Sequence, residues 1–90
     1  MLGLTKSAAL EYAAKGIRVN AVCPGSVLTP MVERALASHP ESMNKVIQDI
    51  PLGRLGGAEE IAAAVLWLCG PAASFVIGHA LVVDGGYTAR

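Results

Sequence analysis

Two short apolar runs separate the helical stretches of this chain. Residues 17–23 are apolar except for Arg18 and Asn20, and the run stops at Pro24-Gly25. Residues 81–83 form a second run, which stops at a turn of Asp and two glycines. Short apolar runs bounded by turn residues predict buried strands, and the unbroken second run is typical of a parallel strand covered on both faces.

Residues 1–15 are rich in strong helix formers, and Gly16 then supplies the residue that ends a helix in the left-handed conformation. No capping residue precedes this helix, so we expect it to be truncated upstream. A second helix is predicted over 29–37, with Thr29 as its N-cap and Pro30 as its first residue.

A third helix is predicted over residues 39–49. Ser38 followed by Glu41 has the spacing of a capping box, with His39 as a surface residue of the cap. A loop with three glycines follows and leads to a fourth helix over 58–69. Glu59 and Glu60 stand in its first turn, where the helix dipole favours carboxylates.

The fourth helix is apolar on all sides from residue 61 to 69. Ile61, Val65 and Leu68 form one stripe, which we expect to cover a sheet, and Ala63 and Trp67 form another, which needs a second partner. The run is too short to cross a bilayer. With two strands and a long helical crossover between them, the pattern predicts an α/β chain with a parallel pair: helix, strand, helices, strand.

Composition makes this an unusual free-standing domain. The chain has 90 residues, of which 53% are hydrophobic and 16% charged, which suggests a piece of a larger assembly. Its net charge of zero gives no basis for binding nucleic acid or an anionic membrane. No signal peptide is visible, so we expect a cytoplasmic protein.

Few residues suggest chemistry of their own. Cys23 and Cys69 lack metal-ligand spacing and are expected to be reduced thiols, with a disulfide or redox role as the alternative. His39 and His79 stand without neighbouring ligands, so no metal site is expected. Tyr12 and Lys15 are three positions apart and read as part of a packed helix face rather than a catalytic pair.

The loop from Pro24 to Thr29 is the strongest candidate for a binding site. It joins the predicted carboxyl end of a strand to the start of a helix, which is where open α/β sheets bind ligands. Gly25 permits a close approach of the backbone, and a helix N-terminus offers free N–H groups.

Taken together, the motifs resemble the short-chain dehydrogenase/reductase family, over essentially the whole chain and in the order of the family. The matching segments are Leu2-Gly3-Leu4-Thr5-Lys6, Gly16-Ile17-Arg18-Val19-Asn20-Ala21-Val22 running into Pro24-Gly25, Thr29-Pro30-Met31, Pro51-Leu52-Gly53-Arg54, Glu59-Glu60-Ile61-Ala62, Val65-Leu66-Trp67-Leu68, and Gly78 followed by Val83-Asp84-Gly85-Gly86.

The resemblance implies the C-terminal part of a Rossmann-like, doubly wound parallel sheet. Residues 1–90 would then be the C-terminal fragment of a single NAD(P)-binding domain, incomplete as a domain, with a lid-like segment at about 30–50. The family's glycine-rich loop, its catalytic serine and its Tyr-x-x-x-Lys pair have no counterpart here. The chain would begin just after the catalytic lysine, so no catalytic residue is expected in it.

The resemblance also implies a cofactor, NAD or NADP, and a hydride transfer to or from a small alcohol or carbonyl substrate. Pro24 and Gly25 match the loop under the nicotinamide ring, Val27 the position whose backbone pairs with the carboxamide, and Thr29 a hydroxyl contact to the cofactor. The choice between the two cofactors, the substrate and the reaction direction depend on residues outside this chain or on the variable lid.

Two other functions remain open on the residues alone. The chain could be a truncated product, natural or from an incomplete sequence, that serves only in assembly. In the family, the segments matching helix 58–69, strand 81–83 and helix 1–15 contact neighbouring subunits, which implies a homo-oligomer, commonly a homotetramer. An independent small α/β domain is disfavoured, because two strands and four apolar helices leave too much surface uncovered.

Overall fold

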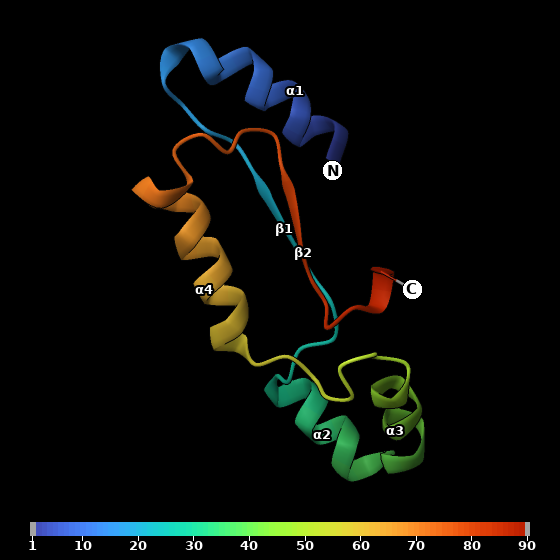
Figure 1. The fold of residues 1–90 in the computed structure, drawn as a ribbon. Helices are drawn as coiled ribbons and strands as arrows, with labels where there is room; N and C mark the ends of the chain where they lie inside the picture. Colours follow the sequence, from blue (N-terminus) through green and yellow to red (C-terminus); the bar gives the residue numbers. More distant parts are fainter. Residues whose placement is uncertain (1, 90) are drawn as a thin grey trace.

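The structure, a computed structural model, describes residues 2–89. The order of helices and strands is the one that the apolar pattern predicts: helix, strand, three helices, strand (Figure 1). The elements are α1 (Leu2–Tyr12), the 3₁₀ turn η1 (Ala13–Lys15), β1 (Ala21–Pro24), α2 (Pro30–Ser38), α3 (Pro40–Gln48), α4 (Ala58–Cys69), the 3₁₀ turn η2 (Pro71–Ala73), β2 (Ala80–Val83) and the 3₁₀ turn η3 (Tyr87–Ala89).

The two strands pair in parallel, as predicted. The register runs from Ala21 opposite Ala80 to Pro24 opposite Val83. Both strands start near α1 and end near α2 and α3, so their carboxyl ends lie at the same end of the molecule (Figure 1). The loop after β1 and the turn after β2 are therefore neighbours, although they lie about sixty residues apart in the sequence.

β1 is shorter than the sequence predicts, because residues 17–20 are held by the loop before β2 rather than by the strand ladder. The side-chain amide of Asn20 donates to the Val76 carbonyl at 3.0 Å, and its oxygen accepts the His79 N–H at 2.9 Å. The Val19 carbonyl accepts the Gly78 N–H at 2.9 Å. These bonds satisfy the backbone before the regular pairing begins at Ala21.

The helix from residue 2 ends as predicted. Gly16 has a φ of 77°, the left-handed conformation that a glycine adopts without steric cost. The last turn tightens to a 3₁₀ turn, and the Lys15 Nζ lies 5.3 Å from the centre of the Tyr12 ring. This cation–π contact gives both side chains a structural role.

The predicted cap of α2 is correct, whereas the predicted cap of α3 is wrong. Thr29 Oγ1 accepts the Val32 N–H at 3.3 Å. Ser38 is the last residue of α2 and makes no capping box with Glu41. His39 stands at the junction instead, because its N–H closes α2 on Ala35 O at 2.7 Å and its carbonyl accepts the Met43 N–H at 3.1 Å.

α4 packs against the sheet along one stripe. Leu68 is buried there, while Trp67 on the other stripe is 47% exposed and Leu66, which lies on neither stripe, is 72% exposed. The carboxyl end of the helix is capped by Arg18, which donates to the carbonyls of Leu68 at 2.7 Å and Gly70 at 3.3 Å. A cation at this end also complements the helix dipole.

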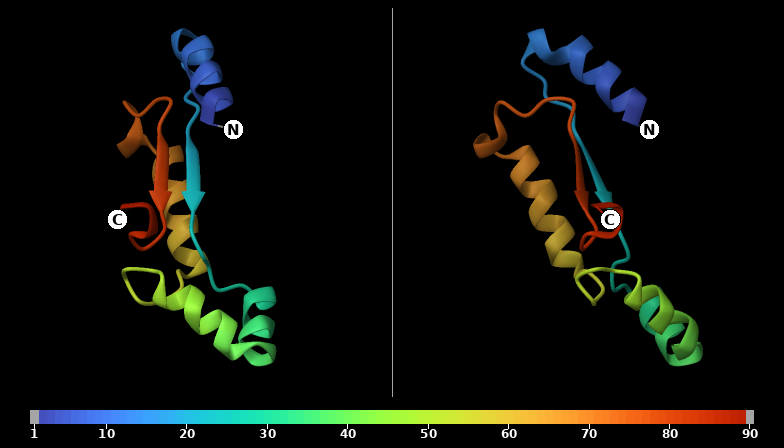
Figure 2. Two further views of the ribbon diagram at one scale, coloured as in Figure 1. Left: turned by 90° about the vertical axis from the view of Figure 1, so that its right-hand side faces the viewer. Right: turned by 45° about the vertical axis from the view of Figure 1, so that its right-hand side comes forward.

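Only one face of the sheet is covered within residues 2–89. α4 runs along one face, and no helix runs along the middle of the other (Figure 2). Val82 points to that open face and is 48% exposed, so the prediction of a strand covered on both faces is not met in this part of the chain. The accessible surface is 6310 Å², against about 4,900 Å² for a compact monomer of this mass.

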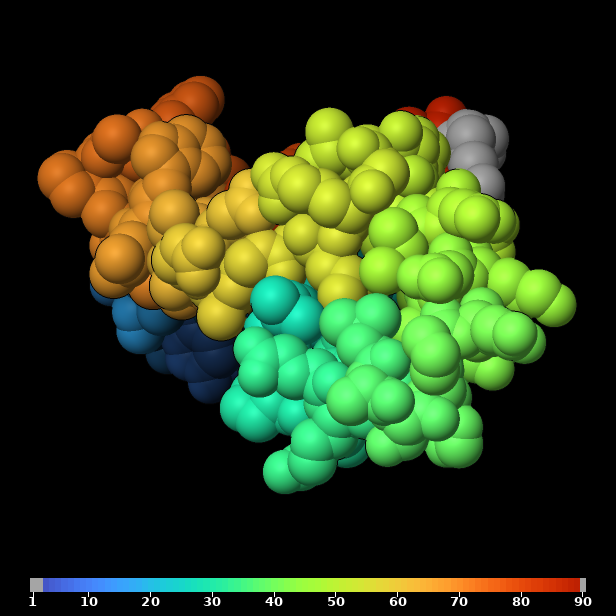
Figure 3. All heavy atoms as spheres, turned by 90° about the horizontal axis from the view of Figure 1, so that it is seen from below, coloured from blue at the N-terminus to red at the C-terminus, as the bar shows by residue number. Residues whose placement is uncertain are grey.

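At the carboxyl end of the strands the elements are more closely packed. Seen from that end, α2, α3, the loop before α4 and the first turn of α4 form one continuous surface that hides nearly all of the sheet (Figure 3). Among residues 2–89, no helix has the length and apolar character needed to cross a bilayer.

Candidate functional site

Gly25 continues the sheet beyond the end of β1. Its N–H donates to the Val83 carbonyl at 3.0 Å, which brings its backbone against Asp84. A Cβ atom at this position would lie 2.7 Å from Asp84 Cβ and 2.9 Å from Asp84 Cα. Glycine is thus required here by close backbone packing.

Val27 lies opposite Gly56 in an isolated parallel bridge. Gly56 donates its N–H to the Ser26 carbonyl at 3.0 Å, and its carbonyl accepts the Leu28 N–H at 2.8 Å. In this pattern the bonds use the residues before and after Val27, so the N–H and carbonyl of Val27 itself point away from Gly56. Within residues 2–89 neither group is hydrogen-bonded. They form a free donor and acceptor pair.

Thr29 lies at the start of α2, two residues beyond this pair. Its hydroxyl oxygen accepts the Val32 N–H, which leaves the hydroxyl proton able to be donated to a ligand. The structure therefore places Pro24, Gly25, Val27 and Thr29 along one continuous segment at the carboxyl end of the sheet.

A hollow of about 320 Å³ lies beside the first part of this segment. Cys23 and Val82 form its floor on the open face of the sheet, and its other walls include Pro24, Gly25 and Tyr87. This volume suits part of a ligand rather than a whole dinucleotide. Val27 and Thr29 do not line the hollow but lie farther along the segment.

The turn after β2 braces Gly25 from the other side. The Asp84 carboxylate accepts the Thr88 hydroxyl at 2.8 Å, the Thr88 N–H at 3.0 Å and the Gly86 N–H at 2.9 Å. The Thr88 hydroxyl, followed by these N–H groups, holds the pKa of Asp84 below its usual value. The carboxylate is thus kept charged, and these bonds fix Asp84, whose Cα and Cβ lie against Gly25.

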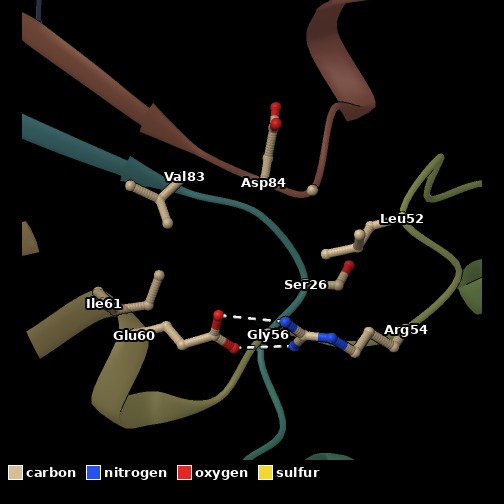
Figure 4. A pocket seen from close by; sticks show the side chains of 9 residues that line it. Ser26, Leu52, Arg54, Gly56, Glu60, Ile61, Val83 and Asp84 are labelled. Carbon is tan, nitrogen blue, oxygen red and sulfur yellow. Dashed lines mark hydrogen bonds and ion pairs between the residues drawn. The ribbon is translucent and has the colours of Figure 1, made fainter. Parts of the chain in front are cut away.

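An ion pair that sequence reasoning did not identify lies on the other side of Val27. The Arg54 guanidinium binds the Glu60 carboxylate through both of its terminal nitrogens, at 2.8 and 3.2 Å (Figure 4). Glu60 also accepts the Gly57 N–H at 2.9 Å. The space between this pair, Leu52 and Val83 measures only about 50 Å³, too small for a cofactor. It is a junction between the loop and α4.

The pKa of Glu60 lies far below its ordinary value. The hydrogen bonds from Arg54, then from the Gly57 N–H, lower the pKa of Glu60 to about 2. The sequence correctly predicted that Glu60 lies in the first turn of a helix, but the interaction with the helix dipole was the only role it suggested for this carboxylate. Only the path of the loop shows that Arg54 returns to it.

This shift predicts a dependence of stability on pH. A carboxyl whose pKa falls on folding stabilises the fold above its unfolded value near 4.5, and the contribution disappears as the pH falls toward 2. We expect the difference in urea midpoint between the unsubstituted protein and Glu60→Gln to be present at pH 6 and to vanish near pH 2. The amplitude is modest because both side chains are exposed. A difference that grows on acidification would contradict this assignment.

The remaining candidate residues make no cluster. Cys23 is half-buried and Cys69 exposed, and both are free thiols. The His79 N–H is bonded to Asn20. Within residues 2–89 no group of three His, Cys, Asp or Glu side chains could hold a metal ion.

Comparison with known proteins agrees with this arrangement. Residues 1–88 match a family model described as enoyl-(acyl carrier protein) reductase. The short-chain dehydrogenase RED2 of Pyricularia oryzae is 54% identical over 88 residues, which are 98% of this chain and 32% of that protein. The 2-(R)-hydroxypropyl-CoM dehydrogenase of Xanthobacter autotrophicus is 49% identical over 89 residues, 99% of this chain and 35% of that protein.

A solved structure shares the fold as well. ElxO with NADP bound superimposes with a TM-score of 0.91 at 36% identity, covering 99% of this chain and 36% of that one. The chain spans about a third of the length of the curated relatives it matches. The match of the family model and these relatives over nearly every residue show that the chain belongs to the short-chain dehydrogenase/reductase family.

Proposed function

We propose that residues 1–90 are the C-terminal part of a single NAD(P)-binding Rossmann-like domain. The whole protein would be an oxidoreductase that transfers hydride between a nicotinamide cofactor and a hydroxyl or carbonyl substrate. The observation that carries the proposal is the unbonded N–H and carbonyl of Val27 at the carboxyl end of the sheet. A carboxamide has the complementary acceptor and donor. ElxO, which has the same fold over this region, binds NADP.

Each of the four site residues has a distinct part in holding the cofactor. Pro24 and Gly25 would lie against the nicotinamide ring, Val27 would bind the carboxamide, and the Thr29 hydroxyl would donate to the cofactor at the start of α2. When bound, the nicotinamide supplies or accepts the hydride. The bracing of Gly25 by Asp84 keeps this segment in one conformation before the cofactor arrives.

The chain by itself is proposed to be inactive. Hydride transfer needs a general acid or base at the substrate. The carboxyl end of α1, which carries the Tyr12–Lys15 contact, lies at the amino ends of the strands, away from the site (Figure 1). The catalytic tyrosine and lysine and the glycine-rich loop would come from the rest of the protein. The lid-like segment of residues 30–50, which contains α2 and α3, would close over the substrate.

Substitution of Val27 by proline tests the carboxamide contact in the full-length protein. Proline removes the N–H of this residue but leaves the bridge to Gly56 intact, because that bridge uses Ser26 and Leu28. We expect the affinity for NADH or NADPH to fall about tenfold, the loss of one hydrogen bond to a ligand. The affinity for the matching ADP-ribose, which lacks nicotinamide, should not change. Titration calorimetry measures both.

Val27→Ala is the matched control, since it shortens the side chain and keeps the N–H. It should bind both ligands as the unsubstituted protein does. Equal losses for NADH and ADP-ribose in Val27→Pro would contradict the carboxamide contact. If the unsubstituted full-length protein binds neither NADH nor NADPH, the proposed function itself is wrong.

A second function, assembly without catalysis, is favoured by one observation. Phe75 is 99% exposed and lies with Trp67 and Leu81 around a shallow apolar hollow next to the outer stripe of α4. We propose that α4, β2 and α1 form contacts in a homotetramer of the whole protein, in the cytoplasm, where both thiols stay reduced. Two measurements on the isolated chain test these proposals. In sedimentation, a folded monomer that does not associate with further copies counts against assembly. In an activity assay, hydride transfer by the isolated chain counts against an inactive fragment.

A further inference from the structure

The position of Val27 depends on a single residue of the loop before α4. Gly56 makes both backbone bonds of the bridge, one to Ser26 and one to Leu28, at 3.0 and 2.8 Å. Within residues 2–89 the backbone of residues 26–28 makes no other hydrogen bond. The direction of the Val27 N–H and carbonyl is therefore set by where Gly56 lies.

Gly56 is itself held from both sides by one carboxylate. Arg54, two residues before it, binds Glu60 with a bidentate ion pair, and Arg54 Nη1 also donates to the Leu55 carbonyl at 3.1 Å. Gly57, the residue after it, donates its N–H to Glu60 Oε1 at 2.9 Å. In Figure 4 the Arg54 and Glu60 side chains extend toward each other on either side of Gly56, and Asp84 points away from them.

Glu60 connects this loop to the rigid part of the molecule. It lies in the first turn of α4, next to Ile61, which together with Val83 lines the small junction described above. α4 is in turn fixed on the sheet by the buried Leu68 and by the Arg18 cap. The contacts therefore run from the sheet through α4 and Glu60 to Gly56, and from Gly56 to Val27.

We propose that the Arg54–Glu60 ion pair is a positioning pair for the cofactor: it holds Gly56 so that the Val27 N–H and carbonyl face the carboxamide. The proposal rests on the proposed function of the site. Neither side chain touches the cofactor in this arrangement. The pair acts through the backbone of Gly56, and the specificity it adds is for the nicotinamide end alone.

The small contribution of this ion pair to stability distinguishes a positioning role from a structural one. The two side chains are 54% and 45% exposed, and ion pairs this open add little to the stability of a fold. Their geometry is bidentate, however, and this fixes direction as well as distance. Loss of the pair should therefore disturb the site more than the fold.

The test compares Arg54→Met and Glu60→Gln with Glu59→Gln in the full-length protein. Glu59 lies in the same turn of α4 and carries the same charge, but its side chain makes no hydrogen bond within residues 2–89, so it controls for the helix dipole. Two quantities are measured: the ratio of the dissociation constants for NADH and ADP-ribose, and the exchange of the Leu28 and Gly56 amide protons. The ratio cancels any effect of charge on the phosphates, which both ligands share.

In Arg54→Met and Glu60→Gln we expect the ratio to rise about threefold to tenfold, with faster exchange of both amides, and in Glu59→Gln no change in either. The double variant should be no worse than the poorer single one, since the two residues act as a unit. In Arg54→Lys the ratio of dissociation constants should rise less than in Arg54→Met, because lysine keeps the positive charge but lacks the two guanidinium nitrogens that bind the carboxylate together.

Unchanged ratios and unchanged amide exchange in Arg54→Met would overturn the proposal, as would equal losses for NADH and ADP-ribose. Failure of the proposed function gives a different result. If the unsubstituted protein binds neither NADH nor NADPH, the site is not a nicotinamide site. The exchange of Leu28 and Gly56 then still decides whether the ion pair holds this loop.

Discussion

Substitution of Gly25 by alanine is expected to damage both the fold and the site. The added Cβ would lie 2.7 Å from Asp84 Cβ and 2.9 Å from Asp84 Cα. Asp84 has little freedom to move, because its carboxylate is bonded to Thr88 and Gly86. We expect the free energy of unfolding to fall by about 2–3 kcal/mol, as for other overpacked positions. Urea denaturation of the full-length protein measures this loss.

The same substitution should also weaken the binding of the cofactor at its nicotinamide end. Gly25 belongs to the nicotinamide side of the proposed site, so NADH should bind at least tenfold more weakly in the folded variant, by the expected displacement of the loop. Gly3→Ala is the matched control: apart from its chain neighbours and the backbone of α1, no atom of residues 2–89 lies within 4 Å of the new Cβ, and the substitution should stabilise the protein by about 0.5–1 kcal/mol. A Gly25→Ala protein as stable as the unsubstituted one would show that Asp84 is not fixed.

Loss of the Arg18 guanidinium is expected to have the second large effect. Arg18 donates to the Leu68 carbonyl, one of the carbonyls that the last turn of a helix leaves without an intrahelical partner, and also to the Gly70 carbonyl, which accepts the Ala73 N–H as well. Arg18→Met keeps much of the apolar stem but removes these bonds and the charge at the end of the helix dipole. We expect a loss of about 2–4 kcal/mol in the free energy of unfolding.

Hydrogen exchange locates the effect. The last turn of α4 and residues 70–79 should lose protection in Arg18→Met before the rest of the protein does, because local openings precede global unfolding. Lys45→Met on α3 serves as control, since Lys45 is exposed and its side chain makes no hydrogen bond or ion pair within residues 2–89, and it should change stability by less than about 0.5 kcal/mol. Equal effects of the two substitutions would contradict a capping role for Arg18.

The contrast between α2 and α3 shows which local signals can be read from the chain. Thr29-Pro30 predicted the cap of α2 correctly, because the threonine hydroxyl and the fixed φ of proline act within one turn. Ser38 and Glu41 have an equally good spacing, yet Ser38 is taken into α2. A capping box competes with one more turn of the preceding helix, and the spacing alone does not decide which is more stable.

By itself the sequence determined the two strands, their parallel pairing, the helix ends at Gly16 and Thr29, and the segment from Pro24 to Thr29 as the candidate site. Those features follow from torsional preferences and from apolar patterns a few residues long. Tertiary structure decided the rest: Asn20 shortening β1, Arg18 capping α4, Gly25 packed on Asp84, and Gly56 between Arg54 and Glu60. Each of these contacts joins groups that come together only because a loop follows a particular path. Local conformational preferences of a few residues do not determine that path.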